Sequence, residues 1–428
     1  MVERTRNIST DLAVIGSGLA GFAASIFALN RNIRTTQVGD SGAVTYTTGY
    51  LDLLGYHFPE PMDLLDDPWR GLQQLKELHP SHPLSRISGN DIRDAFGQVT
   101  DFLNECGIHY SSPGGKNLQA LTPAGTVKPT LCMPETMLPG VNAFHNKKSA
   151  VIVDFKGLKG FSGKQVVANL KNRWPGLTTC RIEFPDARPG ELYPEPMARA
   201  LETPYNREKL ATRLIEAAGG CNYLGLPAIL GIHKPDKVRR ELERLTGLTI
   251  FEIPTMPPAV PGIRLREMFQ QIFPQKGLTL IPQQKVKKLI LHKTRATLEL
   301  TDNLGPVMIE TKCVLLATGR FLSGGLQAGF HGIRESLLDL PVAQPESRSN
   351  WYKKRYTDRN GHPINQAGIE VDSSFRPLDD QKKVFSKNLF AAGSLLAHQD
   401  WIRGRCGAGI ALGTAFKAVE AAAQYLRK

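Results

Sequence analysis

The chain has 428 residues, of which 41% are hydrophobic and 22% are charged. This length and composition suit two or three domains, or one large α/β domain with an insertion, and exclude a wholly disordered chain. The 53 Lys and Arg exceed the 40 Asp and Glu, so the net charge is +13. Such a charge suits an anionic metabolite, an acidic protein, an anionic membrane or nucleic acid. The basic residues are scattered, which argues against a basic nucleic-acid tail.

The six cysteines are far apart in the sequence, and no two form a CxxC pair. Iron–sulfur clusters and structural zinc sites need closely spaced thiolates, so we expect no iron–sulfur cluster and no metal. The pattern suits a reducing cytosol.

The N-terminal region has an apolar stretch over residues 12–29 that is similar to a signal peptide. Asp11 at its start and three spaced glycines within it favour a folded strand and helix instead. No other stretch approaches the roughly 18 apolar residues of a membrane span. We therefore expect a cytoplasmic protein that reaches a membrane only through partners.

The first elements predict a βαβ unit. Asp11–Ile15 has the pattern of a buried strand, Leu19–Asn30 that of a small-residue helix, and Ile33–Val38 that of the next strand. A polar loop follows over Ser41–Gly55, and Asp91–Cys106 is the clearest helix after it. A second α/β alternation covers about residues 149–250. Its main elements are a strand at Val151–Phe155 and helices at Gly163–Asn172 and Arg207–Ala218.

The second half begins with a turn-rich hinge at Pro254–Gly262 and a helix at Arg264–Phe273. Further predicted elements are strands at Leu278–Ile281, Val286–Leu291, Ala296–Thr301, Cys313–Ala317 and Leu389–Ala392, and a last helix at Gly409–Leu426. We predict an α/β fold: a Rossmann-like, FAD/NAD(P)-binding doubly wound sheet with an inserted α/β domain. The sheet domain would comprise residues 8–94 and 271–428, and the insert residues 95–270.

The first functional motif lies between the first predicted strand and helix and reads GSGLAG. It matches G-x-G-x-x-G, in which the first glycine makes a tight turn, the second admits a phosphate and the third lets the helix pack closely. The helix N-terminus would then offer amide groups and a positive dipole end to that phosphate. A tight turn without a ligand is the alternative. The expected cofactor contacts here are Gly16, Ser17, Gly18, Leu19, Ala20 and Gly21.

Two later segments resemble signatures of flavoproteins with two dinucleotide-binding domains. Val314–Gly319 is an apolar strand ending in ATG, and Asn388–Ser394 is a strand that in those proteins ends in Gly-Asp. Ser394 stands in place of that Asp. The helix after Gly407 would point its positive end at the flavin pyrimidine edge. The expected contacts are Thr318, Gly319, Gly393, Ser394, Gly407, Ala408 and Gly409.

An acidic residue that binds an adenosine ribose usually ends the second strand of such a unit. Gly39 stands at that point and Asp40 follows it. Asp40 could bind the ribose from one position later, or no adenosine ribose is bound. FMN has no such ribose, so these residues leave FMN and FAD open.

Thr47, Thr48 and Gly49 lie in the polar loop, where related flavoproteins cover the isoalloxazine ring. We expect them to contact the flavin or its phosphate, with a Thr-rich turn as the alternative.

Over nearly its whole length the chain resembles the B subunit of anaerobic glycerol-3-phosphate dehydrogenase. The matching segments read GSGLAG, TTGYLDLLG, LTPAGT, PTMPPAVPGIRL, LLATGRFLSGGL, GIRE, NLFAAGS and CGAG. The resemblance implies oxidation of sn-glycerol 3-phosphate to dihydroxyacetone phosphate, with quinone as acceptor. It also implies FMN on this chain, a flavin-bearing catalytic partner subunit, and a cysteine-rich, membrane-anchoring partner subunit that links both to the inner membrane.

Oxidation of a secondary alcohol by flavin needs a base for the hydroxyl proton, and a phosphate-bearing substrate needs cationic clamps. His398 follows the Gly393 turn, and Arg405 is close by. Arg264 lies in a family-matching segment. These three are the candidate catalytic residues. Each has an ordinary surface or loop role as its alternative, and the alcohol could also be oxidised wholly on the flavin-bearing partner.

Two other functions remain open. A flavin-dependent RNA-modifying enzyme would suit the positive charge, but aromatic residues are only 7% and no basic, aromatic-interleaved module is present. A structural subunit without cofactor would explain Gly39 and Ser394. Flavin content separates the structural subunit from the dehydrogenase.

Overall fold

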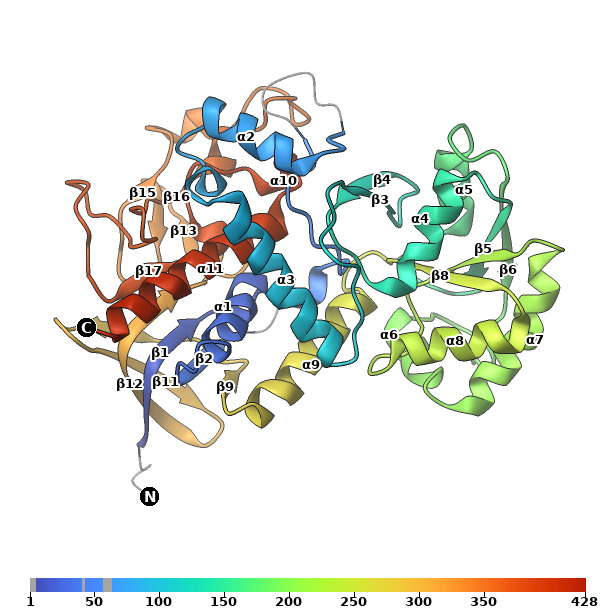
Figure 1. Cartoon of the computed structure of the whole chain (residues 1–428), viewed down its shortest axis with the longest axis horizontal. Helices are drawn as coiled ribbons and strands as arrows, with labels where there is room; N and C mark the ends of the chain where they lie inside the picture. The colour runs from blue at the N-terminus through green and yellow to red at the C-terminus, as the bar shows by residue number, and fades with distance from the viewer. Residues whose placement is uncertain (1–4, 41–42, 57–63) are drawn as a thin grey trace. The chain divides into compact units, whose positions relative to one another are not determined.

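The structure is a computed structural model that describes residues 5–40, 43–56 and 64–428 (Figure 1). The chain divides into two compact units. The first comprises Met1–Ala43, Asp52–Val99 and Phe269–Lys428, and the second comprises Val44–Leu51 and Thr100–Met268. The loop expected over Ser41–Gly55 is thus divided between the units, and residues 41 and 42 lie outside the described residues.

The first unit is built on a seven-stranded sheet with the order β10-β11-β12-β1-β2-β9, and β17 pairs with β12 beside this path. β1 pairs in parallel with both β2 and β12, so that Leu12 lies opposite Cys313. The residues from Leu12 to Val14 have no exposed surface, as expected for a strand buried on both faces. The strands are β1 (Arg6–Ile15), β2 (Thr35–Gly39), β9 (Thr279–Pro282), β10 (Lys288–Leu291), β11 (Ala296–Asp302), β12 (Gly305–Leu316) and β17 (Leu389–Ala391).

Two helices of small residues pack together beside β1: α1 (Leu19–Leu29) and α11 (Gly407–Leu426) (Figure 1). Phe22 of α1 also stacks on Phe269 of α9, with ring centroids 4.3 Å apart. The other helices with residues in this unit are α2 (Pro68–Leu78), α3 (Gly89–Glu105), α9 (Val260–Gln275) and α10 (Trp401–Gly404). Short strands form two antiparallel pairs, β13 (Leu326–Ala328) with β14 (Ile333–Glu335) and β15 (Val342–Ala343) with β16 (Gly368–Ile369).

The second unit has its own parallel sheet, with the order β6-β5-β7-β8. Helices cover both faces, because one apolar core lies under α6, α7 and α8 and another lies under α4 and α5. The elements are β3 (Leu118–Leu121), β4 (Val127–Thr130), α4 (Leu138–His145), β5 (Ala150–Phe155), α5 (Gly163–Leu170), β6 (Leu177–Ile182), α6 (Pro194–Ala200), α7 (Pro204–Ala218), β7 (Tyr223–Pro227), α8 (Pro235–Thr246) and β8 (Thr249–Ile253).

The predicted Rossmann-like α/β class is confirmed by these sheets. The expected hinge at Pro254–Gly262 contains a cis peptide bond between Pro257 and Pro258, but its last residues already belong to α9. Within the described residues, no helix combines the length and apolarity needed to cross a membrane.

Candidate cofactor-binding site

The turn between β1 and α1 is shaped by glycines. Gly16 has φ of +128°, and a Cβ there would lie 2.1 Å from the carbonyl oxygen of Ala317. A Cβ on Gly21 would lie 2.0 Å from the carbonyl oxygen of Gly16. Both positions therefore exclude any side chain, which lets α1 and the end of β12 approach the turn directly.

Two buried polar side chains support the turn from β2 and α1. The Gln37 side-chain amide donates a hydrogen bond of 2.9 Å to the carbonyl oxygen of Gly16. Ser25 in turn donates to the Gln37 side-chain oxygen over 3.0 Å. Both residues have no exposed surface. Sequence reasoning missed Gln37, although a glutamine in the middle of a buried strand is a signal of such a bond.

The N-terminus of α1 is open to an anion. Its N-cap is Gly18, which provides no side-chain cap, and the first turn has no acidic residue. Two hydroxyl oxygens of the glycine motifs, Ser17 Oγ and Thr318 Oγ1, are buried and have no hydrogen-bond partner in the described parts of the chain. A buried hydroxyl without a partner costs about 1–3 kcal/mol. Together, the open helix end and the two hydroxyls fit a bound phosphate and polar cofactor atoms.

The two later motifs meet this turn. Gly319 has φ of +70°, and a Cβ there would lie 3.8 Å from Ser394 Oγ. Gly393 has φ of +81°, and its Cβ would lie 2.7 Å from that of Ala20. The Gly393 amide donates to Thr414 Oγ1 of α11 over 2.8 Å. The first unit therefore brings GSGLAG, ATG and AAGS together, as the order of the motifs indicated.

The start of α11 is also close-packed. The Gly409 amide donates to the carbonyl oxygen of Asp52 over 2.7 Å, and a Cβ on Gly409 would lie 2.5 Å from the carbonyl oxygen of Leu53. Gly407 and Ala408 precede it in the first turn, at the positive end of a 20-residue helix.

The end of β2 has no room for a ribose-binding side chain. A Cβ on Gly39 would lie 2.6 Å from the Ser17 amide nitrogen and 2.8 Å from Ser17 Oγ. The glycine-rich turn thus occupies the space where an acidic side chain would begin. Asp40 is exposed, with Lys285 Nζ 3.8 Å from its carboxylate.

Thr47, Thr48 and Gly49 belong to the second unit. Thr47 Oγ1 accepts a hydrogen bond of 3.2 Å from the Gly49 amide, which closes a local turn. The expected contact of these residues with a flavin stays a prediction.

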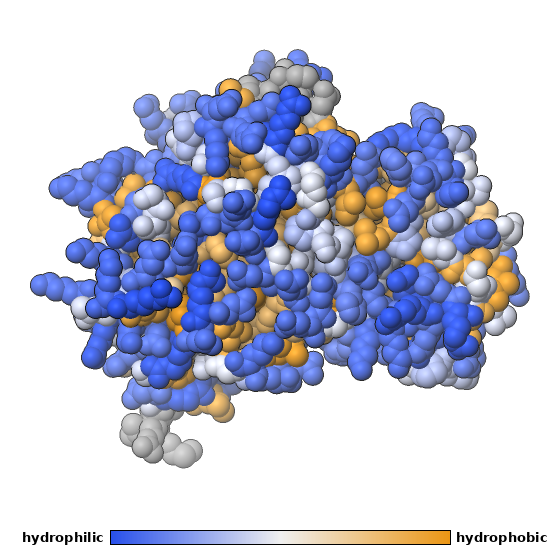
Figure 2. All heavy atoms as spheres, in the orientation of Figure 1, coloured by the Kyte–Doolittle hydropathy of each residue, from blue (hydrophilic) through white to orange (hydrophobic). Residues whose placement is uncertain are grey.

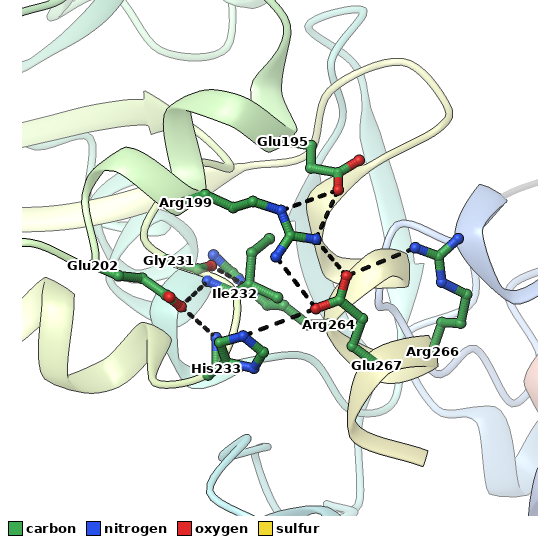
Figure 3. A network of polar contacts seen from close by, with 9 residues as sticks. All are labelled: Glu195, Arg199, Glu202, Gly231, Ile232, His233, Arg264, Arg266 and Glu267. Carbon is green, nitrogen blue, oxygen red and sulfur yellow. Dashed lines mark hydrogen bonds and ion pairs between the residues drawn. The ribbon is translucent and has the colours of Figure 1, made fainter. Parts of the chain in front are cut away.

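Arg264 differs from the expected anion clamp. Its guanidinium makes two hydrogen bonds of 2.7 Å to the carboxylate of Glu252. Its Nε donates to the carbonyl oxygen of Gly231 over 2.8 Å (Figure 3). The side chain is 2% exposed. Because the guanidinium is already bound by a buried carboxylate, it is not free to bind a substrate phosphate.

His398 and Arg405 remain candidates in the first unit. His398 Nε2 lies 2.7 Å from Glu370 Oε1, and Lys382 also pairs with Glu370. Burial alone would raise the pKa of Glu370, but the hydrogen bonds from Lys382 and His398 outweigh it and lower that pKa. Arg405 is exposed, has φ of +46° and ends α10 just before α11.

The described residues contain no cluster of three or more His, Cys, Asp or Glu side chains that could hold a metal ion. The six cysteines are free thiols.

The mixed, mainly parallel sheet, the glycine turn and the two later motifs that meet it define a dinucleotide-fold protein with a cradle for a phosphate-bearing cofactor. Residues 11–410 match the FAD binding domain family, and the chain belongs to that family. It is therefore a flavoprotein of the oxidoreductase type.

Curated relatives confirm the resemblance drawn from the sequence. The B subunit of anaerobic glycerol-3-phosphate dehydrogenase from Vibrio vulnificus (strain YJ016) is 29% identical over 430 residues, which cover 97% of this chain and 96% of the relative. The protein of that name from Aliivibrio fischeri is 28% identical over 445 residues, with 97% and 96% covered. A solved structure of 3-ketosteroid delta1-dehydrogenase from Sterolibacterium denitrificans is 10% identical, with 97% of this chain and 99% of that chain covered and a TM-score of 0.42.

Proposed function

We propose that the chain is the flavin-carrying B subunit of a respiratory sn-glycerol-3-phosphate:quinone oxidoreductase. The observation that carries the proposal is the similarity to proteins of that name over nearly the full length of both chains. In the assembly, the chain oxidises glycerol 3-phosphate to dihydroxyacetone phosphate or relays its electrons toward quinone. It has two partners: a flavin-bearing catalytic subunit, and a cysteine-rich subunit that holds the complex at the cytoplasmic face of the inner membrane.

FMN is the cofactor that we assign, with FAD as the alternative. FMN ends at one phosphate, which suits the open N-terminus of α1 and the buried hydroxyls of Ser17 and Thr318. An adenosine ribose would lack its usual carboxylate, because no side chain fits at position 39. Asp40 is the residue that would have to replace it.

The chemistry of alcohol oxidation divides between cofactor and protein. Bound flavin supplies the acceptor for the hydride from the carbinol carbon. His398 is our candidate acceptor for the hydroxyl proton, held by Glu370 through Nε2 so that Nδ1 is the basic atom. Arg405 is our candidate contact for the substrate phosphate. The second unit, close to the insert expected over residues 95–270, would bind substrate or a partner protein.

The first test is to purify the chain alone, record its visible spectrum, denature it and identify the released flavin by chromatography. Stoichiometric FMN would support the assignment. FAD would assign the ribose contact to Asp40 and point to a more independent dehydrogenase. Absence of flavin, even after reconstitution with FMN and FAD, would contradict the flavin-carrying role and leave a structural subunit.

A second test separates oxidation on this chain from electron relay. Glycerol 3-phosphate is added anaerobically to the flavin-loaded chain, alone and with the flavin-bearing partner. Bleaching without the partner would place the alcohol chemistry here, and His398→Gln should then slow it. Bleaching only with the partner would make this chain the relay.

A further inference from the structure

Large apolar side chains are exposed on three segments of the first unit. The side chains of Tyr356 and Leu322 are 92% and 87% exposed, and that of Ile402 is 52% exposed. Figure 2 shows a mostly hydrophilic visible face, with hydrophobic atoms in separate small patches. Exposed apolar side chains that are scattered singly are ordinary, whereas a contiguous group of them marks an interaction site. The set consists of Phe321, Leu322, Tyr352, Tyr356, Trp401 and Ile402.

Two arginines tie these segments together. Arg403, from α10, donates to the carbonyl oxygens of Asp358 and Arg359. Arg320, next to Phe321, donates to the carbonyl oxygens of Ile364 and Asn365. The exposed side chains therefore belong to one connected structure, which we call the clamped surface: residues 320–322, 351–365 and 400–405.

The loop of the clamped surface is rigidly built. Trp351 is buried, and its carbonyl oxygen accepts a hydrogen bond of 3.1 Å from the Ile364 amide, which closes the loop. His362 Nδ1 accepts from the Lys353 amide over 3.1 Å, while its Nε2 lies 2.9 Å from the carbonyl oxygen of Tyr356. The His362 imidazole thus contacts the backbone on both sides of the loop tip, at Lys353 and at Tyr356. A loop already held in one conformation loses little entropy on binding.

The loop tip is strongly basic. Lys353, Lys354 and Arg355 follow one another between the two exposed tyrosines. None of the three forms an ion pair with another residue of the described chain. Cations that have no ion-pair partner among the described residues, set among exposed aromatic rings, give the composition of a protein-docking site for an acidic partner. A second copy of this chain would present like charges to this surface and is disfavoured.

The clamped surface is continuous with the cofactor cradle. Arg320 directly follows Gly319, and only Cys406 separates Arg405 from the first residue of α11. A partner seated here would lie near the segments expected to surround the flavin. Because electrons cross only short distances between centres, this is the side on which an electron-transfer partner should dock.

We propose that the clamped surface docks an acidic protein partner that exchanges electrons with the flavin of this chain. This inference rests on the proposed function, because it names the face through which the chain would work in its complex. The occupant to which we commit is a partner protein of the complex with an acidic, apolar-centred face, rather than a membrane or a nucleic acid.

The test compares two triple variants in the full chain, co-produced with both partner proteins of the complex. The first variant reverses the charge of the loop tip by Lys353→Glu, Lys354→Glu and Arg355→Glu. Lys287→Glu, Lys293→Glu and Arg295→Glu make the same charge change at exposed positions beside and within the β10–β11 hairpin. We expect the loop-tip variant to weaken assembly at least tenfold at low salt, measured by co-purification and native mass spectrometry. The hairpin variant should assemble like the parent chain. High salt screens charges, so it should reduce the difference in assembly between the loop-tip variant and the parent chain.

A third variant tests the apolar part, with Leu322→Ser and Tyr356→Ser. It should also weaken assembly about tenfold, but with little dependence on salt. Flavin content and thermal midpoint should stay unchanged in all variants, since the substituted side chains are exposed. Equal assembly of all variants would overturn the proposal. Loss of binding to phosphatidylglycerol vesicles with assembly intact would overturn it in favour of a lipid surface.

The outcome is separable from that of the proposed function. If glycerol 3-phosphate bleaches no flavin in the parent complex, the proposed function fails, whereas loss of assembly confined to the loop-tip and apolar variants would still establish the surface. If the substrate bleaches the flavin and the three variants assemble alike, only the surface is wrong.

Discussion

Two sites, one in each unit, differ in how their buried polar groups are paired. In the second unit, Glu252 has no exposed side-chain surface and accepts hydrogen bonds from Arg264, Thr136 and the Leu230 amide. In the first unit, the buried hydroxyl oxygens of Ser17 and Thr318 have no partner among the described residues. A fully paired buried group is a structural feature. A buried group without a partner, beside an open helix end, is prepared for a ligand.

The largest effect that we expect comes from breaking the Glu252–Arg264 pair. Arg264→Met would leave a buried carboxylate unpaired and should lower the free energy of unfolding of the second unit by about 3–5 kcal/mol. Trp174 is fully buried in that unit, and the other three tryptophans lie in the first unit. Urea unfolding followed by Trp174 fluorescence, with the other tryptophans replaced by Phe, would measure this loss.

Arg199→Met is the matched control, because Arg199 belongs to the same polar network (Figure 3) but its side chain is 42% exposed. We expect less than about 1 kcal/mol. An equal loss of unfolding free energy in both variants would mean that burial does not determine how much the Glu252–Arg264 pair stabilises the unit. The double change Glu252→Gln and Arg264→Met should recover part of the loss.

The Glu252–Arg264 pair also predicts that the second unit loses stability at acidic pH. Burial alone would raise the pKa of Glu252, but Arg264 and the hydrogen bonds lower it. A carboxyl group with a lowered folded-state pKa stabilises the fold above its unfolded pKa of about 4.3, and this contribution is lost as pH falls through the folded-state pKa. Urea midpoints of the second unit should therefore decline below about pH 4.3. A double variant with an unchanged acid slope would contradict this assignment.

In the first unit, the next largest effect should follow Gly16→Ala. The positive φ and the contact with the Ala317 carbonyl would both be violated, at a cost of about 1–3 kcal/mol or more. We expect flavin affinity to fall by at least tenfold, as measured by titration of the apoprotein.

Gly97→Ala is the control in the same unit, because a Cβ on Gly97 of α3 would meet nothing within 4 Å. This change should stabilise the helix by about 0.5–1 kcal/mol and leave flavin binding unchanged. Retention of full flavin affinity by the Gly16 variant would show that the turn does not form the cofactor site.

The smallest expected effect on flavin affinity comes from Ser17→Ala, which should change stability and affinity in opposite directions. Ser17→Ala removes a buried hydroxyl that has no partner, so the apoprotein should gain up to about 1–3 kcal/mol. If the hydroxyl binds the cofactor, flavin affinity should fall at the same time by about 1 kcal/mol, or roughly fivefold. Thermal unfolding of apoprotein and flavin titration would show both signs. A gain in stability with unchanged affinity would place the cofactor elsewhere.

The local elements were predictable because their signals are local. The first strand and helix were expected at Asp11–Ile15 and Leu19–Asn30, and α1 ends one residue earlier than predicted. The long β12 was missed in its first half, although polar and apolar residues alternate there as in a half-buried strand, and only its last four residues form a continuous buried run. Pairing with β11 and β1, which the local pattern does not reveal, extends the strand to Gly305.

The polar partners were not predictable, because each lies on a different segment of the chain from the residue that it binds. The pattern around Arg264 gave no sign that Glu252 lies on a neighbouring strand to bind it. Glu370 beside His398 was likewise invisible, since 28 residues separate them. The glycines of the cradle were found because a glycine that the backbone requires is visible in the sequence itself. The hydrogen-bond partner that a polar side chain requires is not visible in the sequence around that side chain.

The pairing of β1 with β12 also constrains how the protein can be made. Leu12 can pair with Cys313 only after about 300 further residues have been synthesised, whereas all strands of the second unit's sheet lie within residues 150–253. At about 5–20 residues per second of synthesis, that wait is roughly 15–60 s. The second unit can therefore fold on the ribosome while the edge of the first strand that pairs with β12 is still open. Chaperones would protect that strand, and flavin could load only when the last helix has emerged.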